Sequence, residues 1–275
     1  MQDLNLHTSC VIMKKESTTK MEILVCIKQV PDDSVNVKMN PATGAPDLSN
    51  ITPIVNAFDT YALEMATRLK EAVGGTITVV CVGPDKAKDA IKTCLAVGAS
   101  NGFIVKDEVT DTISTADALA KAVAKIEEAQ GVKFDLIFCG KETTDCASGQ
   151  VGTMLAANLD VPVIPNLVDI ETIDGGISAK QETEEGYNVV EAATPCVVTV
   201  TKPAYDPRYP TIKSKMAARK IPIGELEVGG VAAAAVSVVA NAEPPKKEAG
   251  IKIQEETIGD SMAKAIAMMK EAKVF

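Results

Sequence analysis

A loop of small polar residues is the part of the sequence best suited to hold a charged ligand. Residues 140–152 read Gly-Lys-Glu-Thr-Thr-Asp-Cys-Ala-Ser-Gly-Gln-Val-Gly and directly follow an apolar run. The glycines permit close approach to the backbone, and the threonine and serine hydroxyls can donate hydrogen bonds to phosphate oxygens. The same composition is also typical of a solvated loop that precedes a serine-capped helix. The loop therefore predicts a phosphate site only where the surrounding elements place it at a ligand-binding edge.

Residues 56–59 and Lys28 could contribute to the same site. Asn56 and Asp59 have the residue types of a helix cap and a first-turn acid, and this structural role is sufficient to explain them. Lys28 comes just after an apolar run, where a lysine is usually solvated but could pair with a phosphate. These residues become candidates for ligand binding only if they meet the 140–152 loop in space.

Buried strands and helices alternate through the first half of the chain. Short apolar runs predict strands at residues 23–27, 76–82, 102–105 and 134–139. Helical spacing of apolar residues predicts helices at residues 56–72, 85–97, 115–129 and 150–159, with end signals at Pro84, Gly98 and Ser114 or Thr115. This order is typical of an open α/β sheet with right-handed crossovers. Such sheets bind ligands at the carboxyl ends of their strands, near a switch in strand order.

The second half of the chain has a different pattern. Alternating runs at residues 168–173, 177–183 and 187–191 predict antiparallel strands added to the sheet, and residues 196–200 predict one more buried strand. Prolines at 207 and 210 exclude a continuous helix or a central strand around them. We expect an N-terminal extension at 1–20, a main domain at 21–229 and a C-terminal arm at 230–275. The last helix of the arm, about residues 259–272, is expected to pack on another protein.

The composition excludes several classes of function. His7 is the only histidine and lies in a polar stretch, so a Ser/His/Asp triad, a Cys/His pair and a His-ligated zinc site are not expected. A net charge of −9 and 3% aromatic residues disfavour nucleic-acid binding. Neither a Walker motif nor G-x-G-x-x-G occurs. Scattered cysteines, with no signal peptide and no spanning run, predict a soluble cytoplasmic protein without membrane insertion.

Six ordered segments carry a resemblance to a known family. They are Val25-Cys26-Ile27-Lys28-Gln29-Val30-Pro31-Asp32, Asn56-Ala57-Phe58-Asp59 with Ala62 and Glu64, Leu95-Ala96-Val97-Gly98-Ala99, residues 140–152, Pro195-Cys196-Val197-Val198-Thr199, and Pro207-Arg208-Tyr209-Pro210 followed by Met216, Arg219 and Lys220. Together they resemble the beta subunit of an electron transfer flavoprotein. The resemblance implies a Rossmann-like nucleotide-binding domain, a three-layer α/β/α sheet that is mostly parallel with antiparallel additions. It also implies a C-terminal arm that packs on an alpha subunit.

The resemblance also implies a nucleotide site, with no catalytic residue and no metal ligand of its own. The implied cofactor-binding residues are Cys26, Asn56, Ala57, Phe58, Asp59, Val82, Gly140, Lys141, Glu142, Thr143, Thr144, Asp145, Cys146, Ala147, Ser148, Gly149, Gln150 and Val151. By their types alone, Cys26 and Val82 suit core packing. The family commonly has Lys-Gln-Ala-Ile-Asp after the glycine, where Glu142, Thr143 and Thr144 stand here. The resemblance therefore implies backbone contacts in this loop.

Beta subunits of this family are of two kinds. One holds a structural AMP, and the other holds a second FAD that accepts a hydride from NADH and bifurcates its electrons. Val30-Pro31-Asp32 and Asp59 resemble the bifurcating kind. That kind implies electron delivery to ferredoxin, and through the FAD of the alpha subunit to an FAD-dependent dehydrogenase of the acyl-CoA or 2-hydroxy-acid type. The recognition loop of the family corresponds to residues 201–206, which lack the leucine of many members and so argue against an ordinary acyl-CoA dehydrogenase.

Three alternatives remain at this point. The first is a non-bifurcating electron carrier whose beta subunit holds AMP. The second is a stress-type ATP-binding module, which shares the layered fold and needs no partner, and the third is a nucleotide-hydrolysing enzyme. Neither the module nor the hydrolase explains the segment at residues 207–210 or the C-terminal arm.

Overall fold

The computed structural model of the chain describes residues 20–243, 245 and 249–274. All of the predicted N-terminal extension except Lys20 lies outside the described residues. The chain divides into two compact units, a larger one that includes residues 47–239 and a smaller one formed by residues 38–46 and the chain from 240 onward. The larger unit contains the candidate site.

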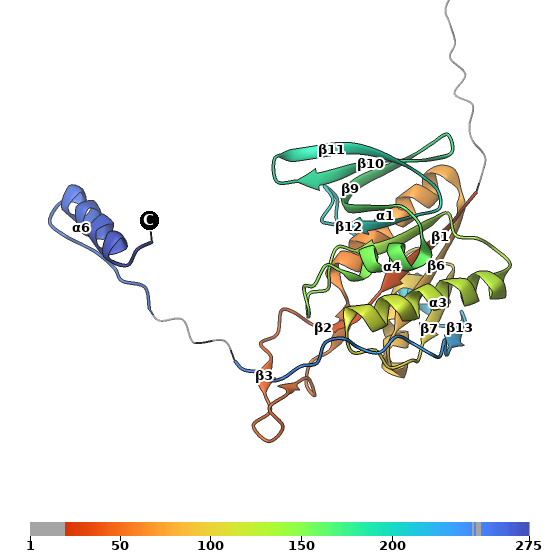
Figure 1. Cartoon of the computed structure of the whole chain (residues 1–275), viewed down its shortest axis with the longest axis horizontal. Helices are drawn as coiled ribbons and strands as arrows, with labels where there is room; N and C mark the ends of the chain where they lie inside the picture. The colour runs from red at the N-terminus through yellow and green to blue at the C-terminus, as the bar shows by residue number, and fades with distance from the viewer. Residues whose placement is uncertain (1–19, 244, 246–248, 275) are drawn as a thin grey trace, which may run out of the picture. The chain divides into compact units, whose positions relative to one another are not determined.

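A nine-stranded sheet is the framework of the larger unit in the described chain (Figure 1). From one edge to the other its strands are β11 (Gly186–Ala193), β10 (Gly176–Thr183), β9 (Val163–Ile173), β12 (Cys196–Val200), β8 (Leu136–Gly140), β1 (Met21–Ile27), β6 (Gly75–Val82), β7 (Asn101–Val105) and β13 (Ile223–Leu226). Seven neighbouring strands pair in parallel: β9, β12, β8, β1, β6, β7 and β13. β10 and β11 are antiparallel additions at the β9 edge. The predicted α/β fold is confirmed.

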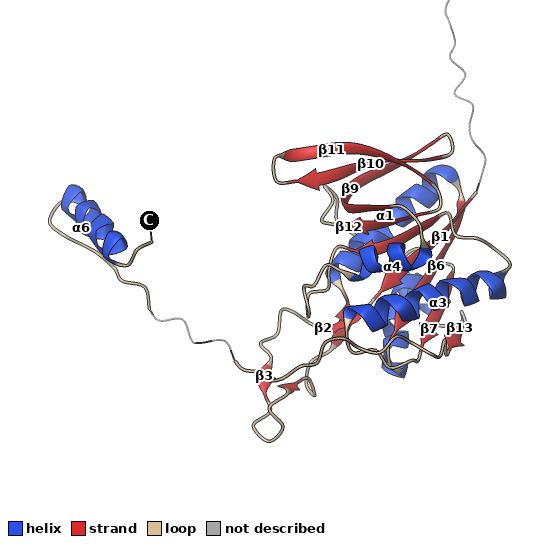
Figure 2. Ribbon diagram, in the orientation of Figure 1, coloured by secondary structure: helices blue, strands red, loops and turns tan. Residues whose placement is uncertain are grey.

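Helices cover both faces of this sheet (Figure 2). One face packs against α1 (Ala57–Val73), α2 (Lys88–Leu95) and α5 (Ile212–Ala218), and the other against α3 (Thr112–Gln130) and α4 (Val151–Leu159). Alternate residues of β1 enter the two cores, with Ile23 and Val25 on the α1 side and Leu24 on the α3 side. Because β1 is buried on both faces, its sequence is a continuous apolar run.

Two predicted helix starts are wrong. The third helix begins at Thr112, ahead of the predicted Ser114 or Thr115 cap, because the Asp111 carboxylate accepts the Ser114 N–H at 2.8 Å and forms a capping box. The helix predicted at 85–97 is a 3-10 turn, Asp85–Ala87, followed by α2, and Pro84 precedes the turn. Both errors arise because apolar spacing marks the face of a helix and not its first turn.

The antiparallel strands extend further than the alternating pattern predicts. In the turn between β9 and β10, Gly175 has a φ of +75°, a left-handed conformation that favours glycine. Strand β9 begins at Val163, although the alternating pattern begins at residue 168. The strand continues through Pro165 because a bulge follows it, where Asn166 has φ +58° and the register with β12 shifts.

Small elements complete the described chain. β2 (Gln29–Pro31) pairs with β5 (Pro53–Val55) in antiparallel fashion, and β3 (Lys38–Met39) pairs with β4 (Pro46–Asp47). In the smaller unit, α6 (Ile258–Glu271) lies within one residue of the predicted last helix. No helix among the described residues is both long enough and apolar enough to cross a membrane.

Candidate functional site

The strand order reverses at the carboxyl ends of β1 and β8. β6 and β7 follow on one side of β1, and β8 returns to its other side, which makes the two ends a topological switch point. Open α/β sheets bind their ligands at such a point. Hydrogen bonds bring together there the residue after β1, the start of α1 and the loop between β8 and α4. These are the segments predicted from the sequence.

Asp59 joins two of these segments beneath the candidate site. One carboxylate oxygen accepts the backbone N–H of Lys28 at 2.7 Å, and the other accepts the N–H of Gly140 at 3.2 Å. The residue is 4% exposed. Burial raises the pKa of the Asp59 carboxyl to about 7, although the Asn56 side chain and the backbone N–H groups of Lys28 and Gly140 act in the opposite direction. Asp59 thus connects the ends of β1 and β8 to the first turn of α1.

Asn56 fixes the loop between β8 and α4. It occupies the N-cap position of α1, but its side chain makes no capping hydrogen bond. Its Nδ2 donates to the carbonyl oxygen of Glu142 at 2.8 Å, and its Oδ1 accepts the N–H of Thr144 at 3.1 Å. The side chain is fully buried. Asn56 and Asp59 therefore occupy the predicted N-cap and first-turn positions of α1, but both ends of the Asn56 amide bind the loop backbone instead of the helix.

An ion pair links the outer parts of the same two loops. Lys28 Nζ lies 2.9 and 2.8 Å from the two carboxylate oxygens of Asp145. Both side chains remain partly exposed. Sequence reasoning missed this pair, because nothing in the local pattern around Lys28 indicates a partner so far along the chain. The pair places a cation next to the loop that is predicted to hold phosphate.

The backbone of the loop suits an anion. Ala147 and Gly149 adopt left-handed conformations, with φ of +50° and +63°. At the N-cap of α4, Gln150 makes no side-chain capping bond, and its Oε1 instead accepts from the Thr112 hydroxyl at 3.0 Å. The first N–H groups of α4 therefore remain available to a ligand. Backbone N–H groups, the exposed Ser148 hydroxyl and the Lys28 cation together fit the phosphates of a nucleotide.

The other predicted site residues line the neighbouring strand and helix ends. Cys26 is buried, and its thiol pKa is raised by a hydrogen bond with Cys139 and by burial. Val82 is half-buried and packs against the cluster that contains Cys26. Ala57 and Phe58 are half-buried at the start of α1. Core packing therefore explains Cys26, whereas the half-buried residues form the edge of the site.

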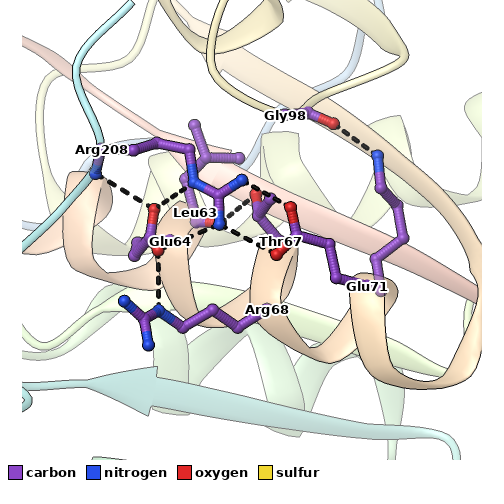
Figure 3. A network of polar contacts seen from close by, with 8 residues as sticks. Leu63, Glu64, Thr67, Arg68, Glu71, Gly98 and Arg208 are labelled. Carbon is purple, nitrogen blue, oxygen red and sulfur yellow. Dashed lines mark hydrogen bonds and ion pairs between the residues drawn. The ribbon is translucent and has the colours of Figure 1, made fainter. Parts of the chain in front are cut away.

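A second polar cluster, also missed from the sequence, fixes the proline-rich segment (Figure 3). Arg208 Nε donates to Glu64 at 2.8 Å, and its Nη1 donates to Glu71 at 2.6 Å. Arg68 Nε donates to Glu64 at 2.7 Å. Burial opposes ionisation of Glu64, but the hydrogen bonds from both arginines outweigh it and lower the pKa of this carboxyl. Residues 206–210 are thereby held on α1, where they line a cavity of about 580 Å³ with residues of α2 and β5.

Comparison with known proteins shows the family of this chain. A family model described as "Electron transfer flavoprotein domain" matches residues 50–230. The electron transfer flavoprotein subunit beta of Megasphaera elsdenii is 38% identical over 82% of this chain and 85% of its own length. The caffeyl-CoA reductase-Etf complex subunit CarD of Acetobacterium woodii is 32% identical over 92% of this chain and 100% of its own length. The acryloyl-CoA reductase electron transfer subunit gamma of Anaerotignum propionicum is 30% identical over 85% of this chain and 92% of its own length.

The matched residues include every part of the candidate site except the end of β1. The relatives extend the match over most of the chain, and they share an electron-transfer role in their names. The chain therefore belongs to the electron transfer flavoprotein family, among its beta subunits.

Proposed function

We propose that this chain binds FAD at the switch point and acts in a heterodimeric, electron-bifurcating electron transfer flavoprotein. The observation that carries the proposal is the fixed loop between β8 and α4, which Asn56 and Asp59 hold beside the end of β1. The N–H groups of this loop and of the first turn of α4 would bind the phosphates. Lys28 would add a positive charge, which it now shares with Asp145.

The protein would bind, orient and shield the cofactor. When bound, the flavin supplies the redox chemistry, accepting a hydride from NADH and passing single electrons to the FAD of the alpha subunit and to ferredoxin. The half-buried residues at the ends of β6 and α1 would exclude water from part of the site. The choice of FAD over AMP rests on Val30-Pro31-Asp32 and Asp59, which resemble the bifurcating kind.

The names of two relatives support an acyl-CoA type of electron partner. One relative belongs to a caffeyl-CoA reductase-Etf complex, and another is an electron transfer subunit of an acryloyl-CoA reductase. We propose that electrons from the alpha subunit reach an FAD-dependent dehydrogenase of the acyl-CoA or 2-hydroxy-acid type, and that the missing leucine in residues 201–206 distinguishes this partner from an ordinary acyl-CoA dehydrogenase. Residues 201–206 would contribute to its recognition.

Anaerobic rapid mixing with NADH tests the redox proposal. On mixing with NADH, the purified heterodimer is expected to lose flavin absorbance without any added dehydrogenase. The physical reason is that the FAD bound by this chain would accept the hydride directly. NADPH serves as the matched control donor. If flavin absorbance is unchanged by NADH but falls when a reduced dehydrogenase is added, the chain is a simple electron carrier.

The C-terminal arm would bind the alpha subunit through α6. Ile258, Met262, Ile266 and Met269 lie on one helical face and are 81%, 59%, 44% and 46% exposed. An apolar stripe of this kind indicates a protein interface. Truncation after Gly250 is expected to leave the larger unit folded but to weaken the heterodimer, as measured by size-exclusion chromatography across a dilution series.

A matched pair of substitutions separates the stripe from the rest of the arm. Ile266→Asp is expected to weaken the heterodimer, because it places a charge in the interface. Ala267→Asp introduces the same charge on the opposite face of α6 and is expected to leave assembly unchanged. Equal assembly of both variants with the alpha subunit would exclude α6 from the interface.

A further inference from the structure

We propose that Asp59 is a positioning residue that fixes the two rims of the nucleotide site, which are the loops that begin at Lys28 after β1 and at Gly140 at the end of β8. Through these rims it makes cofactor binding by this chain dependent on pH. This inference rests on the proposed nucleotide site. It assigns to Asp59 a role that acts through the backbone of the two rims, in place of direct contact with the ligand.

The two hydrogen bonds of Asp59 span the switch point. Lys28, which follows β1, donates to one carboxylate oxygen, and Gly140, the last residue of β8, donates to the other. Asp59 itself belongs to the first turn of α1. A single carboxylate therefore sets the separation between the two strand-end loops and the helix start, and any change in its hydrogen bonding would move both rims.

Asp59 is closely packed against the end of β8. Asp59 is 4% exposed. A Cβ atom built on Gly140 would lie 2.3 Å from Asp59 Oδ1 and 2.8 Å from the Cβ of Phe58, so only glycine leaves room for the carboxylate at this point. This close approach explains the glycine at the end of β8.

Ionisation of Asp59 is what permits both hydrogen bonds. A carboxylate can accept from two N–H donors, whereas a protonated carboxyl presents its own O–H toward one of them and loses that bond. The pKa of Asp59 is raised to about 7 by burial, so this change falls near neutral pH. As the pH rises through this value, Asp59 ionises, both rims are held and affinity for the cofactor increases.

The other groups that face Asp59 do not reproduce this change. Lys28 is the charged residue beside it, and Cys26 on β1, Cys81 on β6 and Cys94 on α2 are the thiols within electrostatic reach. A hydrogen bond with Cys139 and burial raise the pKa of Cys26, burial raises that of Cys81 to about 12, and burial also raises that of Cys94. The thiols therefore stay neutral around neutral pH, and Asp59 is the group that titrates.

Titration of FAD into cofactor-depleted heterodimer at a series of pH values tests the inference. FAD is the probe because its own charge is constant across this range. With a pKa of about 7, the ionised fraction of Asp59 rises from about one tenth near pH 6 to about nine tenths near pH 8, so the affinity should rise about tenfold. Asp59→Asn should bind FAD more weakly near pH 8, since its amide Nδ2 faces an N–H donor. Its affinity for FAD should not change with pH.

A matched control distinguishes this role from general stability. Asp107 also accepts two backbone N–H groups, those of Val228 and Gly229. Asp107→Asn is expected to show the same increase of FAD affinity with pH as the natural chain. A flat or falling affinity of the natural chain with rising pH would overturn the inference even if Asp59→Asn fails to fold. Failure to bind FAD at every pH would instead overturn the proposed cofactor.

Discussion

Gly149→Val is expected to abolish nucleotide binding by this chain in the assembled heterodimer. Gly149 has φ of +63°, a left-handed conformation that costs about 1–2 kcal/mol for a residue with a Cβ and more for a branched one. The built Cβ lies no closer than 3.7 Å to a protein atom, Lys141 O, so the side chain enters space that the ligand would occupy. The valine would both distort the loop and fill the phosphate site.

Two controls isolate the binding effect. Gly131→Val places the same residue at φ of +67°, at the end of α3 with no protein atom within 4 Å, and should leave binding unchanged. Ser148→Ala removes one hydroxyl and should weaken binding by about 0.5–1.5 kcal/mol, because the N–H groups remain. Calorimetric titration of each heterodimer with FAD provides the comparison. Equal losses in Ser148→Ala and Gly149→Val would contradict a site built from backbone N–H groups.

Arg208→Ala is expected to lower the free energy of unfolding by about 3 kcal/mol. The Glu64 side chain is 3% exposed, and Arg208 donates to both of its oxygens. Removing one partner of a buried ion pair typically costs about 3–5 kcal/mol, because the other charge is left buried. Arg68 still donates to Glu64, which keeps the expected loss near the low end. Urea denaturation followed by circular dichroism measures the change.

The guanidinium fork explains why lysine cannot fully replace this arginine. Arg208 also binds Glu71 through two nitrogens, a pattern that a single ammonium cannot make. Arg208→Lys should therefore recover only part of the loss, and the exposed Arg219→Ala should change the free energy of unfolding by less than about 0.5 kcal/mol. If Arg208→Ala is as stable as Arg219→Ala, the ion pairs of Arg208 with Glu64 and Glu71 in Figure 3 do not stabilise the fold.

Local pattern was sufficient to predict most of the fold. The runs at 23–27, 76–82 and 102–105 lie within buried strands, because a strand covered on both faces must be apolar throughout. The run at 134–139 starts two residues ahead of its strand, since β8 begins at Leu136. The alternating runs at 168–173, 177–183 and 187–191 likewise indicated the antiparallel strands β9, β10 and β11. β13 was not predicted, since its short sequence, Ile-Gly-Glu-Leu, carries little apolar signal and is defined by pairing with β7.

The candidate site was predicted as a set of places but not as a set of contacts. The switch point follows from the order of strands and helices, which sequence patterns indicate. The hydrogen bonds of Asn56 to Glu142 and Thr144 depend on how α1 meets a loop that is remote in sequence. The same holds for the pairing of Lys28 with Asp145 and of Arg208 with Glu64. Composition and spacing carry information about residues that are close in the sequence. Hydrogen bonds and ion pairs between residues that are remote in the sequence therefore could not be predicted from them.

The nucleotide content of the heterodimer tests the central claim most directly. The complex would be purified without oxygen, extracted with acid and analysed by chromatography, with protein measured by amino-acid analysis. We expect two FAD and no AMP per heterodimer, and loss of one FAD in Gly149→Val but not in Gly131→Val. One FAD together with one AMP would contradict it and would make this chain the beta subunit of a simple electron carrier.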